Sequence, residues 1–501
     1  MGLTKIHWRQ GGTEMAISVL HLKERKTQAE PLPGRVLYHL SLDRAFSHIC
    51  HDVKKQQRFM SVISNLMDDT SEILFRQAIL KDFESNPTLL NELTALSARF
   101  EELRVSQKNI RRDELGSNST GTASSTASKN ILSTKALCLK RALLFVKAYG
   151  DLLAQFDLNS NGLRSLLSAC KELSENAEFS KLITFCSKYE YFSEYGYLDY
   201  KYVLNDEGCI ETYELIDHRY IHVTDPAIKK KSVSLFKKVN VVTYPCVQLA
   251  PGKDIFFENL AITAFSEQSK MFENLSEQIF ERFGAIGGEL VFYEVAIQYI
   301  QTLSEKGVSV CYPTVSKDKS INIKKLYDLY LLFSKPNASE VIPNDILING
   351  AGLLVFGNNG SGKTVYLRSL GSAQILAQAG LPLPCDYAKI SLFSQLATQF
   401  SEAEKEFCTG NDAGRFEQEV RELAEMVNTL KEGAFVLLNE TFQSTAYAEG
   451  AEGLYHLLVH FSALNIRWIL VSHLNQLEEK MRNFDIDVLY LIGHKHNKYM
   501  G

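Results

Sequence analysis

Hydrophobic residues recur at spacings of three and four over most of the first two thirds of the chain. The pattern begins in "GRVLYHLSLDRAFSHIC" at Gly34 and continues to about Val105, with Asp69 and Thr70 placed as helix caps. It resumes at "TKALCLKRALLFVKAYGDLLAQF" and returns over residues 258–307. The pattern therefore predicts a mostly helical core, in which residues 258–307 form a long helix pair or lever.

Two stretches interrupt this helical pattern. Residues 116–130, "GSNSTGTASSTASKN", carry no hydrophobic anchor that would offset the entropy lost on ordering, so we predict a flexible linker. After about Tyr189, the runs "YFSEYGYLDYKYVL" and "CIETYELIDHRYIHV" are aromatic and β-branched, with short turns between them. We therefore predict antiparallel strands inserted over about residues 190–255.

From Ile346 the pattern changes to an apolar strand, a glycine-rich loop and a helix. Further apolar runs, "AFVLL", "IRWILVSH" and "DVLYLIG", alternate with helical segments. This alternation is typical of an α/β sheet with parallel strands. The predicted fold class is multidomain, α and α/β, with a helical segment over residues 1–115, a linker over 116–130, a core and lever over 131–330, and an α/β nucleotide-binding domain over 331–501.

Length, composition and charge favour a soluble, multidomain globular protein. The length of 501 residues favours several domains, and 45% hydrophobic with 23% charged residues is typical of soluble globular proteins. A formal net charge of -5 means that any nucleic-acid contact needs a local basic surface. Nine cysteines without a CxxC pair indicate neither a disulfide framework nor a structural metal. No signal or membrane-spanning pattern is present, so we expect a cytoplasmic protein without membrane association.

The segment "GNNGSGKT" fits the phosphate-binding pattern GxxxxGK[ST] and lies between an apolar strand and an amphipathic helix. In such a site backbone amides surround the phosphates, Lys363 contacts the β and γ oxygens, and the Thr364 hydroxyl contacts magnesium. A chance match to a glycine-rich turn is the alternative, which the strand-loop-helix context disfavours. The candidate nucleotide-binding residues are Gly357, Asn358, Asn359, Gly360, Ser361, Gly362, Lys363 and Thr364.

Candidate catalytic residues follow two later apolar strands. Glu440, after "AFVLL", can orient the attacking water or be an exposed strand-end acid, and His473, after "IRWILVS", can sense the γ-phosphate or be an ordinary strand-end histidine. Asn439 stands where such a strand commonly carries a second acid that holds magnesium; it keeps an oxygen donor but removes a charge. We therefore expect a slow, working ATPase, with a non-hydrolysing nucleotide binder as the alternative.

These motifs together resemble the MutS family of DNA mismatch-repair ATPases. The likeness lies in "IPNDILING" before the phosphate loop, "GLPLPCDYAKISLFSQLAT" after its helix, and the later "EVRELAEMVNTL", "NETFQSTAYAEGAEGL" and "LVSHL". Weaker likeness is found in "SEILFRQAILKDFESN" for the helical core and "GGELVFYEVAIQYIQTLSEKGVSVCYPTV" for the lever. The resemblance implies a P-loop ATPase domain of the ABC type, ATP and Mg²⁺ as cofactors, a homodimer, and DNA as a partner.

The chain departs from the family pattern at several places. No mismatch-reading domain with its Phe-x-Glu wedge is evident, which counts against direct mismatch recognition. No nuclease tail is evident either, so we expect no nicking. The family completes its ATP site with a Ser/Thr-rich turn from the partner subunit, whereas "GNDAGRFEQEV" has Gly414, Arg415 and Phe416 there. Arg415 can supply a cation or cap a surface helix. Val341 stands where the family commonly stacks an aromatic side chain on the base.

One basic cluster in "DPAIKKKSVSLFKKVN" is suited to DNA phosphates rather than bases, although the sequence alone favours a solvated loop. Its members are Lys229, Lys230, Lys231, Lys237 and Lys238. We expect a dimeric clamp on duplex, mismatched or branched DNA that serves repair or recombination. The alternative is an ATP-switched protein-interaction module with weak or no hydrolysis. A chromosome-maintenance ATPase is disfavoured, because no long heptad pattern or Leu-Ser-Gly-Gly signature occurs.

Overall fold

The structure is a computed structural model that divides into two compact units, each described by itself below. The first unit comprises Met1–Ser18, Thr88–Leu158 and Leu163–Gly288, and the second comprises Val19–Pro87, Asn159–Gly162 and Glu289–Gly501. The residues described are 16–22, 31–119, 125–189, 196–204, 210–220, 254–316, 320–400, 412–442, 447–474, 476–493 and 499–500.

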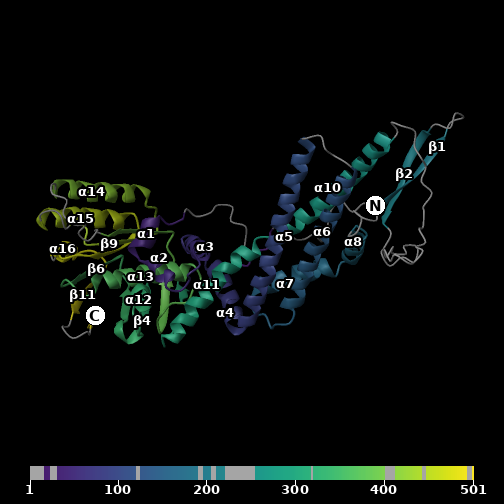
Figure 1. The fold of residues 1–501 in the computed structure, drawn as a ribbon. Helices are drawn as coiled ribbons and strands as arrows, with labels where there is room; N and C mark the ends of the chain where they lie inside the picture. Colours follow the sequence, from purple (N-terminus) through teal and green to yellow (C-terminus); the bar gives the residue numbers. More distant parts are fainter. Residues whose placement is uncertain are drawn as a thin grey trace. The chain divides into compact units, whose positions relative to one another are not determined.

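Long helices and a β-hairpin make up the first unit (Figure 1). Phe100 packs against Phe145, Tyr149 and Phe280, so one aromatic cluster joins three of the helices. The buried Lys135 ammonium lies 2.8 Å from the Glu273 carboxylate and joins α6 to α10. The elements are α5 (Pro87–Ser119), α6 (Ser125–Leu153), α7 (Asn161–Ser174), α8 (Ala177–Ser187), β1 (Gly196–Leu204), β2 (Ile210–Tyr220) and α10 (Asp254–Phe283).

Two predictions for this part of the chain have different outcomes. The antiparallel strands predicted after Tyr189 are present, since β1 pairs with β2 in antiparallel register. α5 continues to Ser119 and α6 begins at Ser125, so both helices extend into the predicted linker of residues 116–130, and the linker itself stays a prediction. Extending an existing helix adds one hydrogen bond per ordered residue, so helices anchored elsewhere can continue through polar sequence. The lysine cluster falls in residues 221–250, which lie outside the described residues.

A six-stranded sheet forms the centre of the second unit, in the order β12-β11-β6-β10-β9-β8. All neighbouring strands are parallel except β11 and β12, so the parallel α/β sheet predicted from Ile346 onward is confirmed. Its strands are β6 (Gly352–Gly357), β8 (Gln395–Phe400), β9 (Ala434–Asn439), β10 (Arg467–Val471), β11 (Ile486–Gly493) and β12 (Tyr499–Met500).

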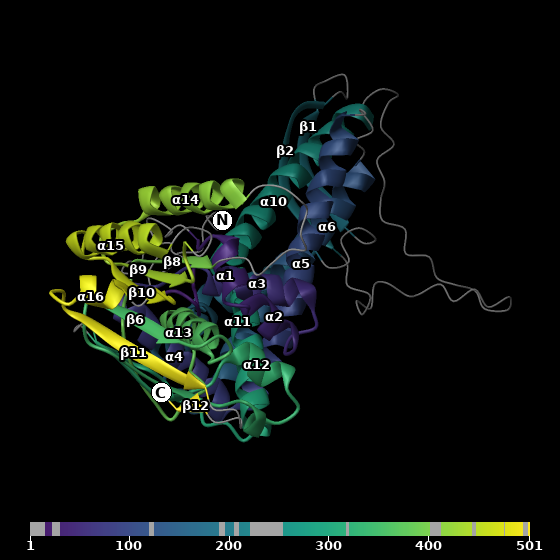
Figure 2. The same ribbon diagram turned by 90° about the vertical axis from the view of Figure 1, so that its left-hand side faces the viewer.

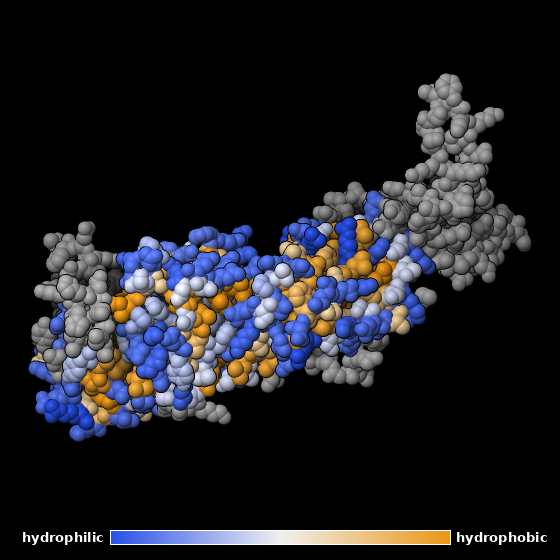
Figure 3. Space-filling view, turned by 90° about the horizontal axis from the view of Figure 1, so that it is seen from below, coloured by the Kyte–Doolittle hydropathy of each residue, from blue (hydrophilic) through white to orange (hydrophobic). Residues whose placement is uncertain are grey.

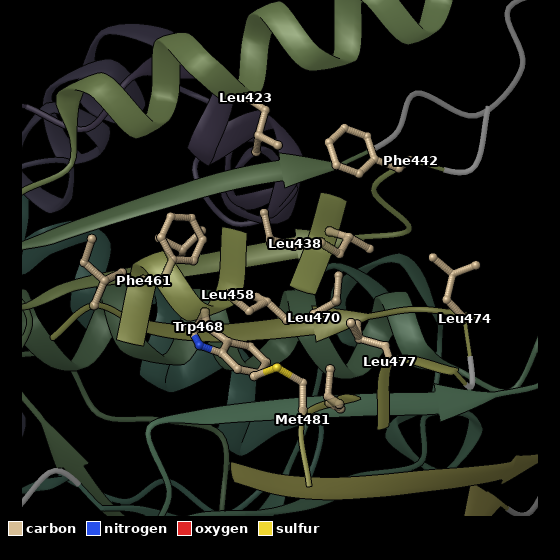
Figure 4. Packing of buried hydrophobic residues seen from close by; sticks show 14 of the residues in the cluster. Leu423, Leu438, Phe442, Leu458, Phe461, Trp468, Leu470, Leu474, Leu477 and Met481 are labelled. Carbon is tan, nitrogen blue, oxygen red and sulfur yellow. The ribbon is translucent and has the colours of Figure 1, made fainter. Parts of the chain in front are cut away.

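Helices cover both faces of this sheet. Figure 2 shows α14 (Asp412–Thr429) and α15 (Tyr447–Ala463) on one face and α13 (Lys363–Gln378) on the other. Apolar side chains of α14, α15 and the short α16 (Gln476–Lys480) belong to one buried cluster that includes the fully buried Trp468 (Figure 4). Burial on both faces explains why the strands β9 and β10 read as continuous apolar runs rather than as alternating patterns.

A second, four-stranded mixed sheet, which the sequence pattern did not reveal, lies in the same unit. Its order is β3-β7-β4-β5, and only β3 and β7 are parallel. Its strands are β3 (Thr314–Ser316), β4 (Ile321–Leu326), β5 (Asn344–Ile348) and β7 (Tyr387–Ser391), with α12 (Leu329–Ser334) and the 3₁₀ helix η1 (Ala338–Glu340) between β4 and β5.

The first helices of the chain belong to this second unit, so a boundary at residue 115 does not follow the compact units. Buried polar contacts explain the difference: Arg76 of α4 donates to the Ala379 carbonyl at 3.3 Å, and Gln378 donates to the Met67 carbonyl at 2.8 Å. Asp69 accepts from the Ser71 amide, which confirms it as the cap of α4. These helices are α1 (Gly34–His39), α2 (Leu42–Ser47), α3 (Val53–Ile63) and α4 (Thr70–Ser85), which lie together with α11 (Ile286–Glu305).

Figure 3 shows one face of the molecule, on which hydrophobic residues lie among hydrophilic ones. Within the described residues, no helix combines the length and the apolar character needed to cross a membrane.

Gly352 is predicted to tolerate no side chain, because it lies directly beside Trp468 in the β6–β10 pairing. A Cβ atom added at Gly352 would lie 2.2 Å from the Trp468 ring, which is fully buried and has no room to move. We expect Gly352→Ala to lower the free energy of unfolding by about 1–3 kcal/mol, as overpacking does. Chemical denaturation followed by tryptophan fluorescence measures the loss.

Gly34→Ala is the matched control, since a Cβ atom there meets no atom within 4 Å. Equal denaturation midpoints for the Gly352 and Gly34 variants would contradict the packing described for Trp468.

Candidate functional site

The glycine loop, residues 357–362, connects the carboxyl end of β6 to the first residue of α13. Gly360 and Gly362 have φ angles of 78° and 95°, in the left-handed region that other residues rarely adopt. Gly362 is also the residue before the helix, so the loop turns sharply and its backbone amides precede a helix N-terminus. Such a terminus attracts anions, and phosphate in particular.

Lys363 lies inside this loop with only 4% of its side chain exposed. Its ammonium donates to the carbonyl oxygens of Gly357 at 2.8 Å and Asn358 at 3.2 Å. Burial lowers the pKa of Lys363, and the nearby Glu440 carboxylate opposes that shift. The buried Ser361 Oγ has no hydrogen-bond partner among the described residues. A buried cation and an orphaned hydroxyl in one loop fit a phosphate group, which accepts hydrogen bonds from both.

Thr364 and Asn439 meet beside the loop. The Thr364 hydroxyl donates to Asn439 Oδ1 at 3.3 Å, which joins the first turn of α13 to the last residue of β9. Magnesium is commonly bound by one or two protein oxygens together with phosphate oxygens and water. The two side chains fit that role, and both oxygens are neutral.

Glu440 stands between two nitrogen groups from other elements. Its Oε1 lies 2.9 Å from His473 Nε2 and 3.7 Å from Lys363 Nζ. The side chains of Glu440 and His473 are 25% and 31% exposed, so water has access to the carboxylate. The structure thus brings together Lys363, Glu440 and His473, which the sequence placed on three separate segments.

The parallel sheet explains this convergence. The carboxyl ends of neighbouring parallel strands meet at one edge, where α/β folds commonly bind ligands. The Glu440 amide donates to the Val471 carbonyl at 2.9 Å, and the Ser472 amide donates to the Val355 carbonyl at 3.1 Å. These bonds continue the pairing of β9, β10 and β6 up to the site.

Other predicted site residues stay predictions. Gly414, Arg415 and Phe416 fall in α14, and both readings of Arg415 remain open. Val341 is 5% exposed and follows η1.

A buried ion pair that no sequence pattern indicated fixes the start of α13. Arg368, one turn after Thr364, donates to both carboxylate oxygens of Asp328 at 2.8 Å, and its guanidinium lies over the Tyr330 ring. Asp328 also caps α12 through the Leu331 amide. A carboxylate before an apolar run signals a helix cap, but nothing in the sequence indicates that an arginine 40 residues later shares it.

Comparison with known proteins finds a family match within the second unit. Residues 353–495 match the family model described as MutS domain V. The chain is 30% identical over 236 residues to the DNA mismatch repair protein MutS of Microcystis aeruginosa, covering 44% of this chain and 26% of that protein. It is 23% identical over 248 residues to the endonuclease MutS2 of Alkaliphilus metalliredigens, covering 46% and 30%.

A third relative also matches only part of the chain. The DNA mismatch repair protein MutS of Leptospira interrogans is 27% identical over 184 residues, covering 36% of this chain and 21% of that protein. The chain therefore spans about a quarter of the length of the curated relatives that it matches.

The Asp328–Arg368 pair is predicted to be important for stability, because the carboxylate is 1% exposed and the guanidinium 13%. Asp328→Asn keeps a cap for α12 but removes the charge, which leaves a largely buried cation without its partner. We expect a loss of about 3 kcal/mol in the free energy of unfolding, measured by chemical denaturation.

Glu417→Gln provides the control, because Glu417 and Arg421 form an exposed pair at 3.1 Å. We expect this change to alter the free energy of unfolding by no more than about 0.5 kcal/mol. A similar small effect for Asp328→Asn would show that the buried pair does not fix α13.

Proposed function

Since this chain belongs to the MutS family through its domain V, we propose that it binds and slowly hydrolyses ATP with Mg²⁺ to switch a homodimeric, DNA-binding clamp. The observation that carries the proposal is the convergence of Lys363, Glu440 and His473 beside the glycine loop. A phosphate-binding cation and a carboxylate that can hold water are the two groups that nucleotide hydrolysis needs.

Nucleotide binding rests on the glycine loop and its helix. The backbone amides of residues 358–362 and the Lys363 ammonium would hold the phosphates, and the orphaned Ser361 hydroxyl would gain a partner there. Thr364 and Asn439 would hold Mg²⁺, which neutralises charge on the phosphates when bound.

The hydrolytic step is assigned to Glu440. Its carboxylate accepts a hydrogen bond from the attacking water, and His473 Nε2 holds the same carboxylate at 2.9 Å. Attack of that water on the γ-phosphorus breaks the bond to ADP and releases phosphate. Asn439 supplies an oxygen without a negative charge, so it holds Mg²⁺ less strongly than a carboxylate does. Slow turnover suits a switch better than a motor.

A role on DNA rests on the family and on the basic cluster. Two of the relatives are DNA mismatch repair proteins by name, and one is an endonuclease. The five lysines of residues 229–238 would contact phosphates without reading bases. The competing proposal is an ATP-switched module whose helical unit binds a protein.

Glu440→Gln is expected to lower kcat for ATP hydrolysis by about two orders of magnitude while leaving ATP and Mg²⁺ binding intact, because the proposed phosphate and metal contacts are made by other residues. Asn439→Asp is expected to reduce the Mg²⁺ concentration needed for half-maximal turnover. Steady-state ATPase assays across a magnesium titration measure both effects, with nucleotide binding measured separately.

Lys363→Ala is the control that separates binding from chemistry, and we expect it to lose tight nucleotide binding while staying folded. Equal turnover for the wild type and Glu440→Gln would remove the catalytic role of Glu440. Unchanged ATP affinity in Lys363→Ala would refute the phosphate assignment.

DNA binding is expected to weaken when the five lysines are replaced by glutamine, because each lysine lost removes one phosphate contact. Filter binding to duplex and branched DNA, with and without ATP, measures the affinity and its salt dependence. The slope of affinity against salt should become shallower in the variant. An unchanged slope would show that the five lysines do not contact DNA. If the wild-type protein binds no DNA, the protein-interaction module is favoured.

A further inference from the structure

The backbone around Glu440 has an unusual conformation. Glu440 and Phe442 have φ angles of 56° and 64°, both in the left-handed region. Non-glycine residues held in such conformations cost about 1–3 kcal/mol each, and they persist only where surrounding contacts hold them. The direction of the Glu440 side chain therefore depends on what fixes the two residues that follow it.

Thr441, between these two residues, is fixed by a buried hydrogen bond. Its hydroxyl donates to Gln399 Oε1 at 2.5 Å. Thr441 is 2% exposed and Gln399 6%, so water cannot readily replace either partner. Gln399 is the penultimate residue of β8, whose pairing with β9 places it beside Leu438. The bond thus joins the rigid end of one strand to the turn that follows the next.

Two further contacts hold the backbone on either side of Thr441. The Glu440 amide is bound to the Val471 carbonyl, which fixes the residue on the strand side. Phe442 is 9% exposed and belongs to the apolar cluster of α14 and α15, as Figure 4 shows. A Cβ atom added at Gly453 would lie 3.4 Å from the Phe442 ring, in close contact. The hydrogen bond from the Thr441 hydroxyl to Gln399 adds a directional contact between these two anchors.

We propose that Gln399 and Thr441 form a positioning pair that directs the Glu440 carboxylate toward His473 and Lys363. The inference rests on the proposed function, in which Glu440 orients the attacking water. Without the hydroxyl, the strained turn is free to relax, and the carboxylate moves away from its place beside the glycine loop. A displacement of about 1 Å at a reacting group can cost about 100-fold in rate.

Thr441→Val tests the pair, because it removes the hydroxyl and keeps the shape of the side chain. We expect kcat to fall about tenfold or more, with the KM for ATP unchanged within about twofold, since the phosphate contacts remain. Thr441→Ser should restore most of the rate. Gln399→Met should lower kcat as Thr441→Val does, and the double variant should lose little more, since both changes break the same bond.

Thr398→Val is the matched control. Thr398 is 1% exposed and its hydroxyl lies 2.8 Å from Nδ1 of the half-buried His39, so its replacement also removes a side-chain hydrogen bond from β8. Alternation along the strand places Thr398 on the opposite face from Gln399. We expect a comparable loss of stability in denaturation experiments and no change in kcat.

A second measurement reports the carboxylate without any turnover. The side-chain ¹⁵N NMR resonance of His473 Nε2, recorded without nucleotide, is sensitive to its contact with Glu440. In Thr441→Val we expect it to shift toward the position found in Glu440→Gln. Thr398→Val should leave it unchanged.

Wild-type kcat together with an unchanged His473 resonance in Thr441→Val would overturn the positioning role. If Thr441→Val does not fold, wild-type kcat and an unchanged His473 resonance in Gln399→Met would overturn the positioning role. A wild type without ATPase activity would contradict the proposed function, whereas a shifted His473 resonance in Thr441→Val would still support the positioning pair.

Discussion

The parallel hydrogen bonding of β6, β10 and β9 is the constraint on which the site depends. Val471 pairs with Asn439 on one side and with Val355 on the other, so three segments far apart in sequence end at one edge. The glycine loop, Glu440 and His473 follow those ends directly. A slip of one residue in this register would turn Asn439 and its neighbours toward the opposite face and separate them from Thr364.

Helix α13 connects this edge of the sheet with the helices that precede it in the chain. Its first residue is Lys363, and the carbonyl of Ala379, just past its last residue, accepts from the buried Arg76 of α4. Gln378 binds the Met67 carbonyl and also the Phe393 carbonyl, which leads into β8. Movement of α13 on a change of nucleotide would have to break these buried bonds or move α4 with it. The second unit therefore has a direct physical connection from the glycine loop to its helices.

Local sequence patterns predicted those features of the candidate site that are formed by residues close together in the sequence. The glycine loop follows from the spacing of Gly357, Gly362 and Lys363, and Glu440 and His473 follow from apolar runs that end in a polar residue. The helix cap at Asp69 was predictable in the same way, because the capping side chain and the backbone amide that it binds are close in sequence.

Contacts between distant residues were not predictable in this way. Gln399 meets Thr441, and Arg368 meets Asp328, only because the sheet and α13 bring them together. The mixed sheet stayed hidden because β3 has three residues and carries no alternating pattern. The polar composition of residues 116–130 likewise cannot reveal that the two flanking helices extend into this segment.

A crystal structure with Mg²⁺ and a non-hydrolysable ATP analogue would test the central claim most directly. The account predicts phosphates within the glycine loop beside Lys363, the metal between Thr364 and Asn439, and a water held by Glu440 in line with the γ-phosphorus. An analogue bound elsewhere, or one bound in the loop with Glu440 turned away from the γ-phosphate, would contradict it.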